Sequence, residues 1–150
     1  MVSVPDHSDD PLTELLNGVH ELSYSMGRSQ VHEQIAAGID VKVERAGFAV
    51  LRALLEGPLR FGVIAERLLV RAPHVTRQVA LLEEQGLVQR SQNVADQRAQ
   101  LVGLTDQGRF VVEQYNQSIR ERLSRTLDDL PAEHIRIAAR VIARMAANAA

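Results

Sequence analysis

The stretch from Ile64 to Thr105 constrains the fold of this 150-residue chain more than any other part of the sequence. It opens with two short runs in which apolar residues recur at the i, i+3/i+4, i+7 spacing of one helix face. The first run holds Ile64, Ala65 and Leu68, and the second holds Val75, Val79 and Leu82. Only residues 69–73 separate the two runs, which is a connection of the length expected in a helix-turn-helix.

The residues after the second run predict a β-hairpin. Gly86 is placed to end the helix in the left-handed conformation that glycine adopts readily. Residues 87–90 and 100–104 then flank a polar tip, as two strands joined by a loop would. Because a helix-turn-helix followed by a hairpin is a winged helix, we expect a mainly α (α+β) fold with a two- or three-stranded β-wing.

Four short motifs in this stretch follow one another in a characteristic order and spacing. They are IAERL at 64–68, VTRQVALLEEQGLVQR at 75–90, DQR at 96–98 and LTDQG at 104–108. Each motif alone is common, whereas the four together resemble the MarR family of bacterial transcription regulators. The resemblance implies a homodimeric repressor that binds a palindromic operator in double-stranded DNA and is released from it by a small ligand.

Apolar stripes also run along the terminal segments. Asp10 and Pro11 mark the start of the first helix, and Thr105 is a good N-cap for a long helix beyond the wing. The stripes exceed what one small core can cover, so we expect the terminal helices of two chains to form a homodimer. Within a single domain, 1–150, we therefore assign residues 43–104 to the DNA-binding winged helix, with a helix over 43–55, and residues 12–36 and 105–149 to dimerisation helices. The stripe residues are Leu12, Leu15, Leu16, Val19, Leu22 and Met26, then Val112, Tyr115, Ile119, Leu123, Leu127 and Leu130, then Ile135, Ala138, Val141, Ile142 and Met145.

The net charge of −2 is distributed unevenly along the chain. Residues 1–44 carry −6, residues 45–104 carry +3 and residues 105–150 carry +1. The net positive charge thus lies mainly on the expected winged helix, where it would attract DNA phosphates. Sixteen of the seventeen basic residues are Arg, which suits bidentate contacts to phosphate and guanine, although a GC-rich genome would give the same bias.

The N-terminal end of the second helix of the pair is the expected DNA reader. Side chains there reach base edges when such a helix enters the major groove. We expect Arg77 to contact guanine and Gln78 to contact adenine, with Thr76 on a phosphate. A phosphate contact or a salt bridge to Glu66 or Glu83 remains an alternative for Arg77. The candidate DNA-binding residues here are Pro73, His74, Thr76, Arg77 and Gln78.

The wing supplies the remaining candidate DNA contacts. In the MarR family, which the chain resembles, the D-x-R pair holds the wing and sends its Arg into the minor groove. The resemblance therefore implies that Arg98 enters the groove and that Asp96 orients it. Arg90 either pairs with Asp96 or touches a phosphate. The alternative interpretation of the wing is that it does not read the DNA sequence at all.

The sequence departs from the family pattern at three places. The recognition helix usually opens with a Ser or Thr cap, where this chain has Arg71, Ala72 and Pro73. Leu69 stands where the turn often has Gly, and Gln97 stands where a basic residue is common. These departures affect the expected base preference rather than the fold.

The resemblance also implies a small aromatic or lipophilic acid as effector, bound between the dimerisation helices and the winged helix. His20, Tyr24, Phe48 and Arg52 are the candidate lining residues, with a core or surface role as the alternative for each. The chain has no Cys, and its five His residues never occur at metal-binding spacing, so we expect no metal and no cofactor.

Other functional classes fit the sequence less well. The chain lacks a G-x-S-x-G elbow, a P-loop, a G-x-G-x-x-G turn and a Cys nucleophile, so we expect no enzyme activity. A winged helix used for protein contact would need an apolar recognition face, and PadR-like or ArsR-like winged helices match the D-x-R and L-T motifs less closely. With no long apolar run and no leader pattern, we expect a cytoplasmic protein without membrane contact.

Overall fold

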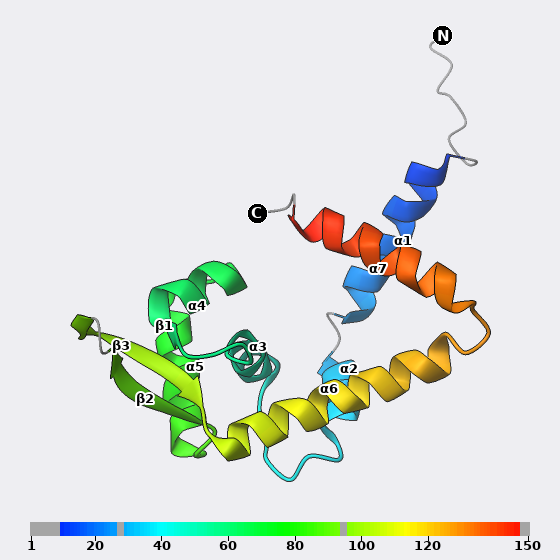
Figure 1. The fold of residues 1–150 in the computed structure, drawn as a ribbon. Coiled ribbons are helices and arrows are strands. Elements are labelled where there is room, and N and C mark those ends of the chain that lie inside the picture. Colours follow the sequence, from blue (N-terminus) through cyan, green and yellow to red (C-terminus); the bar gives the residue numbers. More distant parts are fainter. Residues whose placement is uncertain (1–9, 27–28, 94–95, 148–150) are drawn as a thin grey trace. The chain divides into compact units, whose positions relative to one another are not determined.

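The computed structural model describes residues 10–26, 29–93 and 96–147, while the side chains of residues 26, 29, 30, 93 and 96–99 fall outside that description. Within these ranges the chain forms seven helices and three strands (Figure 1). It divides into two compact units, residues 1–116 and 117–150, and the division falls inside the sixth helix. The mainly helical fold with one small sheet confirms the predicted fold class.

The first unit opens with helices α1 (Pro11–Met26) and α2 (Ser29–Ala36). Helix α1 begins where the sequence predicts, because the Asp10 carboxylate accepts hydrogen bonds from the Leu12 N–H at 3.4 Å and the Thr13 hydroxyl at 3.2 Å. These bonds stabilise the start of a helix, whose first N–H groups have no partner within the helix itself. The segment predicted as one dimerisation region, 12–36, thus contains two helical elements.

Helix α3 (Arg45–Ala53), strand β1 (Leu59–Arg60) and helices α4 (Phe61–Leu68) and α5 (Ala72–Glu84) build the helix-turn-helix. Figure 1 shows α3, α4 and α5 gathered beside the hairpin. Their apolar faces meet in one core, as the helical periodicity predicts. The largest fully buried side chains are Phe48, Val50, Leu51, Leu54, Ile64, Val75, Val79, Leu82, Leu87, Val102 and Val112.

The turn between α4 and α5 is shorter than the five residues predicted. It spans residues 69–71, because Ala72 and Pro73 belong to the first turn of α5. A proline is tolerated there, since its missing N–H would have had no partner within the helix. The sequence analysis counted Pro73 in the connection and also among the residues at the start of the recognition helix, and the structure places it in the helix start.

The wing is an antiparallel sheet in the order β1-β3-β2, with β2 at Val88–Asn93 and β3 at Asp96–Leu104. Val88 pairs with Leu104, and Leu59 of β1 pairs with Val102. The strands run further than predicted, because the expected loop residues beyond Arg90 continue the pairing as far as Gln92 opposite Gln100. Polar side chains do not interrupt the hydrogen bonds between the strands, since these bonds join backbone N–H and C=O groups.

Helix α6 (Asp106–Thr126) starts at the predicted Thr105 cap. The Gly108 N–H donates to the Thr105 hydroxyl oxygen at 3.0 Å, and that hydroxyl donates to the Gly86 carbonyl at 2.6 Å. Gly86 has the left-handed φ of +70° that the sequence predicts. The end of α5 and the start of α6 are therefore joined through a single threonine side chain.

Apolar side chains are exposed on helices at both ends of the chain. Helix α7 (Ala132–Ala147), in the second unit, has no buried residue among those described, and its Ile142 is 59% exposed. In the first unit, Leu12 and Leu16 of α1 are 72% and 52% exposed. Faces of this kind are typical of surfaces that another protein covers. None of the helices in the described part of the chain is long and apolar enough to cross a membrane.

Leu69 adopts a left-handed conformation, with φ at +53°, and its side chain is 78% exposed. We expect Leu69→Gly to raise the free energy of unfolding by about 0.5 kcal/mol. The reason is that relief of about 1–2 kcal/mol of backbone strain exceeds the roughly 0.5–1 kcal/mol that glycine loses in chain entropy. Urea unfolding at fixed protein concentration measures this change. Val70→Gly, where no left-handed backbone is relieved, should lower stability, and a less stable Leu69→Gly would contradict the expectation.

Candidate nucleic-acid interface

Helix α5 presents its N-terminal half to solvent and packs its opposite face into the core. Val75, Val79 and Leu82 are buried against the rest of the helix-turn-helix, as their spacing predicts. Pro73, His74, Thr76 and Arg77 are exposed. The structure thus brings four of the five predicted recognition residues together at one end of one helix.

Gln78 does not belong to this exposed set. Only 5% of the residue is accessible to solvent, so the prediction that it lies on the free face and reads adenine is wrong. Position 78 lies three residues after Val75 and four before Leu82, which places it on the buried stripe. The Gln78 amide lies next to Gly47 of α3, since a Cβ built on that glycine would be 3.6 Å from the Gln78 Oε1 atom, an ordinary contact distance.

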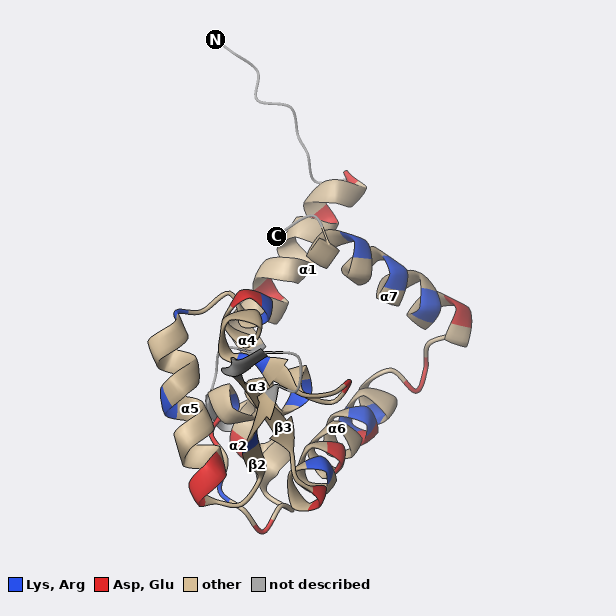
Figure 2. Ribbon diagram, turned by 60° about the vertical axis from the view of Figure 1, so that its left-hand side comes forward, with Lys and Arg blue, Asp and Glu red and all other residues tan. Residues whose placement is uncertain are grey.

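The charge along α5 changes sign from one end to the other. Arg71 and Arg77 lie at its N-terminal side and Glu83 and Glu84 at its C-terminal end (Figure 2). Both arginines are exposed, and neither forms a salt bridge among the side chains that the structure describes. Arg71 occupies the N-cap position without a side-chain cap bond. The sequence analysis named Arg71 only as a missing cap, although its place directly before the helix was a signal for a basic contact.

Thr76 has a partner within its own helix. Its hydroxyl donates to the Ala72 carbonyl at 3.1 Å, which leaves the oxygen lone pairs free to accept but commits the hydroxyl proton. Because a phosphate oxygen accepts hydrogen bonds, the hydroxyl would have to rotate away from Ala72 to serve the phosphate contact predicted for it.

Arg90 is held by neighbours that the sequence analysis did not predict for it. Its Nε lies 3.0 Å from a carboxylate oxygen of Glu83, and its guanidinium carbon lies 5.4 Å from the centre of the Phe61 ring. Only 33% of the Arg90 side chain is exposed. Arg90 therefore joins the end of α5 to the base of the wing, and this ion pair also removes Glu83 as the predicted alternative partner of Arg77.

The predicted wing-tip contacts can be placed only in part. Asp96 and Arg98 belong to β3 through their backbones. Their side chains, and all of residues 94–95, lie outside the described residues.

The predicted ligand residues are not gathered around one cavity in the described part of the chain. His20 and Tyr24 are exposed on α1, and Arg52 is exposed on α3. Phe48 is 1% exposed and stacks on Tyr115 with ring centres 3.9 Å apart, so the core role that was its alternative is the one observed. The prediction that Phe48 lines an open crevice is wrong, because the stacked tyrosine covers it.

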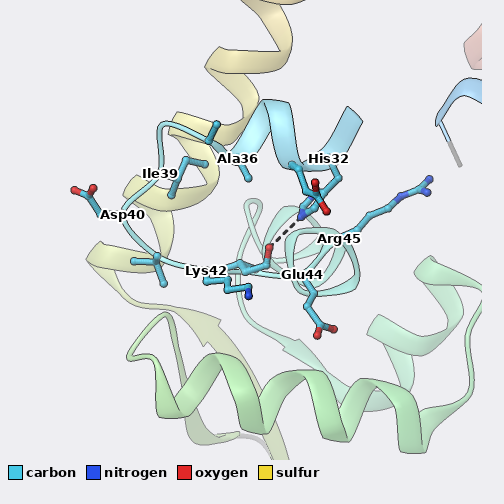
Figure 3. Close-up of a pocket in the computed structure, with 11 residues that line it drawn as sticks. His32, Ala36, Ile39, Asp40, Lys42, Glu44 and Arg45 are labelled. Carbon is cyan, nitrogen blue, oxygen red and sulfur yellow. Dashed lines mark hydrogen bonds between the residues drawn. The ribbon is translucent and has the colours of Figure 1, made fainter. Parts of the chain in front are cut away.

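A hollow of about 630 Å³ lies instead between α2 and the loop that leads into α3 (Figure 3). In Figure 3, Ala36 and Ile39 lie near each other at one end of the lining, whereas Asp40, Glu44 and Arg45 point outward, away from the other labelled residues. Its lining residues are His32, Glu33, Ala36, Ala37, Ile39, Asp40, Val41, Lys42, Val43, Glu44 and Arg45. No group of three or more His, Asp or Glu side chains in the described ranges is arranged to hold a metal ion.

His32 connects this hollow to the core. Its Nε2 lies 3.0 Å from the Val43 carbonyl oxygen, and its Nδ1 lies 3.1 Å from the Tyr115 hydroxyl. Burial raises the pKa of the Tyr115 hydroxyl, and the charges of Arg45 and Arg52 oppose that rise. Tyr115 thus keeps its proton at neutral pH and can donate it to Nδ1, while Nε2–H donates to Val43. The sequence analysis did not single out His32, because its partners lie 11 and 83 residues away.

A helix-turn-helix followed by a three-stranded wing, with an exposed basic helix end, defines a winged helix-turn-helix protein. The model of the MarR family matches residues 44–99, which include α3, α4, α5 and much of the wing. Over residues 44–99 the chain is therefore similar to the MarR family, as the four sequence motifs predict. The members of this family are transcription regulators and not enzymes.

Two relatives from Bacillus subtilis (strain 168) carry the description HTH-type transcriptional regulator, and both are called uncharacterized. YdgJ is 38% identical over 74 residues, which are 49% of this chain and 45% of YdgJ. YdgG is 27% identical over 112 residues, which are 73% of this chain and 74% of YdgG. The first match thus spans less than half the length of that relative.

Solved structures extend the similarity to nearly the whole chain. A MarR family protein from Bacillus stearothermophilus is 18% identical with a TM-score of 0.77, over 97% of this chain and 98% of the other. The PcaV transcriptional regulator from Streptomyces coelicolor, solved with its natural ligand, is 22% identical with a TM-score of 0.63, over 99% and 100% of the two chains. At these identities the likeness is one of fold.

Proposed function

We propose that this chain is a homodimeric, sequence-specific DNA-binding transcriptional regulator that represses from a palindromic operator and is released by a small ligand. The observation that carries the proposal is the exposed basic end of α5 beside the wing. Arg71 and Arg77 are unpaired among the described side chains, while the core face of the same helix is fully buried. A helix held in this way can enter the major groove and present its first turns to base edges.

We assign a separate role to each group of helices and strands. Residues 43–104 bind DNA, with Pro73, His74, Thr76 and Arg77 on the recognition helix and Arg98, oriented by Asp96, in the minor groove. Arg90 supports the wing through Glu83 rather than serving mainly as a phosphate contact. The dimer is formed by residues 12–36 and 105–149, because the exposed apolar side chains of α1 and α7 would be buried against a second chain. A regulator of this kind acts on DNA in the cytoplasm.

Release by a ligand has support from the family and from this chain. PcaV has been solved with a natural ligand, so a protein of this fold can hold a small molecule. The resemblance implies an aromatic or lipophilic acid, whereas this chain offers a hollow of about 630 Å³ beside α3. Cavities of roughly 300–1,000 Å³ are typical of small-molecule sites.

Selection from a random duplex library, followed by fluorescence anisotropy titration of the enriched duplex, tests the proposal. A regulator with two recognition helices should enrich a palindrome with half-sites about one helical turn apart. Failure to enrich any sequence, with equal affinity for enriched and scrambled duplexes, would overturn the proposal.

Arg77→Ala should reduce the preference for the enriched duplex over scrambled DNA by about tenfold or more, because a bidentate contact to guanine contributes about 1–3 kcal/mol of discrimination. The two affinities are measured by anisotropy at one salt concentration. Arg120→Ala, which removes an exposed arginine of α6 outside the helix-turn-helix, is the matched control and should leave the preference unchanged. An equal loss on both duplexes would make Arg77 a phosphate contact.

A further inference from the structure

Leu69 is the most exposed large apolar side chain of the helix-turn-helix. Within the described residues 61–84, the exposed large apolar side chains are those of Leu69, Val70 and Leu81, at 78%, 37% and 38%. Leu69 also has a left-handed backbone, with φ at +53°. Any residue with a Cβ is strained in that conformation, whereas glycine adopts it freely. The chain therefore holds a bulky apolar side chain in solvent at a position where glycine would fit the backbone better.

The backbone around Leu69 is fixed by two hydrogen bonds at the end of α4. The Leu69 N–H donates to the Glu66 carbonyl at 3.1 Å, and the Val70 N–H donates to the carbonyl of the buried Ala65 at 3.0 Å. A contact made by the Leu69 side chain thus requires little further ordering of the chain. Strained backbone positions that the surrounding fold maintains are typical of functional sites.

Leu69 lies at the same end of α5 as the candidate DNA contacts. Arg71 is the N-cap residue and the helix begins at Ala72, and every residue from 69 to 74 is exposed. The three chain links from Leu69 to Ala72 span at most about 10 Å. This length corresponds to about three steps of 3.4 Å along a DNA strand. When the first turn of α5 enters the major groove, Leu69 can therefore reach the neighbouring base pairs.

The surroundings of Leu69 favour DNA over a protein partner. Arg67 and Arg71 stand two residues before and after it, and both are exposed, although Arg67 also pairs with Glu56 at 3.5 Å. A standard protein interface buries about 800 Å² on each partner, which a leucine and a part-exposed valine between two arginines cannot provide. The arginines suit phosphates, and the C5-methyl group of thymine is the apolar group that base edges present in the major groove.

We propose that Leu69 contacts the C5-methyl group of one thymine in each half-site of the operator, so that the turn before α5 contributes to base preference. The inference rests on the proposed function and adds a residue that is not among the DNA contacts predicted from the sequence. Glycine at this position would relieve the backbone strain but would have no side chain to contact the methyl group.

Replacement of thymine by deoxyuridine tests the contact, because uracil lacks the C5-methyl group and keeps the same hydrogen-bonding groups. Each thymine of the enriched duplex is replaced in turn, at symmetry-related positions of both half-sites, and affinities are measured by anisotropy at one salt concentration. The wild type should lose affinity by about tenfold at one pair of positions, since burial of one methyl group contributes about three- to fourfold per half-site. Leu69→Ala, which keeps the Cβ and the strained backbone, should bind the thymine and deoxyuridine duplexes of that pair equally.

Two further variants separate the contact from effects on folding. Leu69→Gly is expected to be more stable than the wild type, and it should also bind the two duplexes equally, so that loss of the thymine preference cannot follow from unfolding. Leu123→Ala removes a leucine that is exposed on α6, outside the winged helix, and it should keep the full preference.

A Leu69→Ala variant that keeps the full preference for thymine would overturn the inference. An equal loss of affinity for both duplexes would then indicate a contact to the sugar-phosphate backbone, and an unchanged affinity would favour a protein partner for this side chain. A wild type without a deoxyuridine penalty at any thymine would refute the inference alone. A chain that enriches no duplex would refute the proposed function as well.

Discussion

Gly108→Ala is expected to lower the free energy of unfolding by about 3 kcal/mol, at the upper end of what overpacking usually costs. A Cβ at this position would collide with the carbonyl oxygen of Leu87, and it would lie 2.8 Å from the carbonyl carbon of the same residue. These are backbone atoms, so no rotamer change can relieve the contact. Leu87 is itself fixed, because its N–H donates to the Leu82 carbonyl at 2.9 Å and its carbonyl accepts from the Thr105 N–H at 3.1 Å.

Urea unfolding of Gly108→Ala and the wild type at one protein concentration measures this loss. Gly62→Ala is the matched control, because a Cβ on Gly62 meets nothing within 4 Å and the residue is exposed in α4. The free energy of unfolding of Gly62→Ala should be about 0.5 kcal/mol higher than that of the wild type, since alanine favours a helix more than glycine does. A Gly108→Ala protein that unfolds like the wild type would show that α6 and the backbone of Leu87 do not approach so closely in solution.

Ile142→Asp is expected to convert the proposed dimer into monomers at about 10 µM and to lower operator affinity by about a hundredfold. Two-fold symmetry would place two unpaired carboxylates in one apolar interface, and each buried charge without a partner costs several kcal/mol. A monomer would hold one half-site only and would lose the gain from linking two binding modules. Ile142 is 59% exposed in the single chain and shares a face of α7 with Ile135 and Met145.

Sedimentation and anisotropy measure the two effects separately. Arg140→Asp introduces the same carboxylate two positions away, on the opposite side of α7, and should remain dimeric. If Ile142→Asp stays a dimer with unchanged DNA affinity, α7 does not form the interface. A monomeric wild type would contradict the assignment of both terminal regions.

The sequence predicted those features that local rules control. Apolar spacing predicted the two helices of the helix-turn-helix, Gly86 predicted the left-handed end of α5, and Asp10 and Thr105 predicted helix starts that the structure confirms. Each of these features depends on residues within about one helical turn, so a linear pattern contains the necessary information.

Features that depend on distant partners could not be predicted in this way. Gln78 is buried on the side of α5 that lies next to α3, where its amide contacts Gly47, 31 residues earlier in the chain. Arg90 is held by Phe61 as well as by Glu83, and the first of these comes from the start of α4. The contacts of His32 join three elements whose meeting is set by the tertiary fold. The hollow beside α2 has no sequence pattern of its own, because a loop encloses it.

Sequence-specific DNA binding by the winged helix is tested most directly by one titration. The enriched duplex and a scrambled duplex of the same composition are titrated with the full chain at several salt concentrations. We predict a slope of about −4 or steeper in the logarithm of affinity against the logarithm of salt, since each phosphate contact contributes about −0.9. We also predict a preference of about a thousandfold or more for the enriched sequence. Affinities that depend neither on salt nor on base order would contradict the assignment of α5 and the wing as a DNA reader.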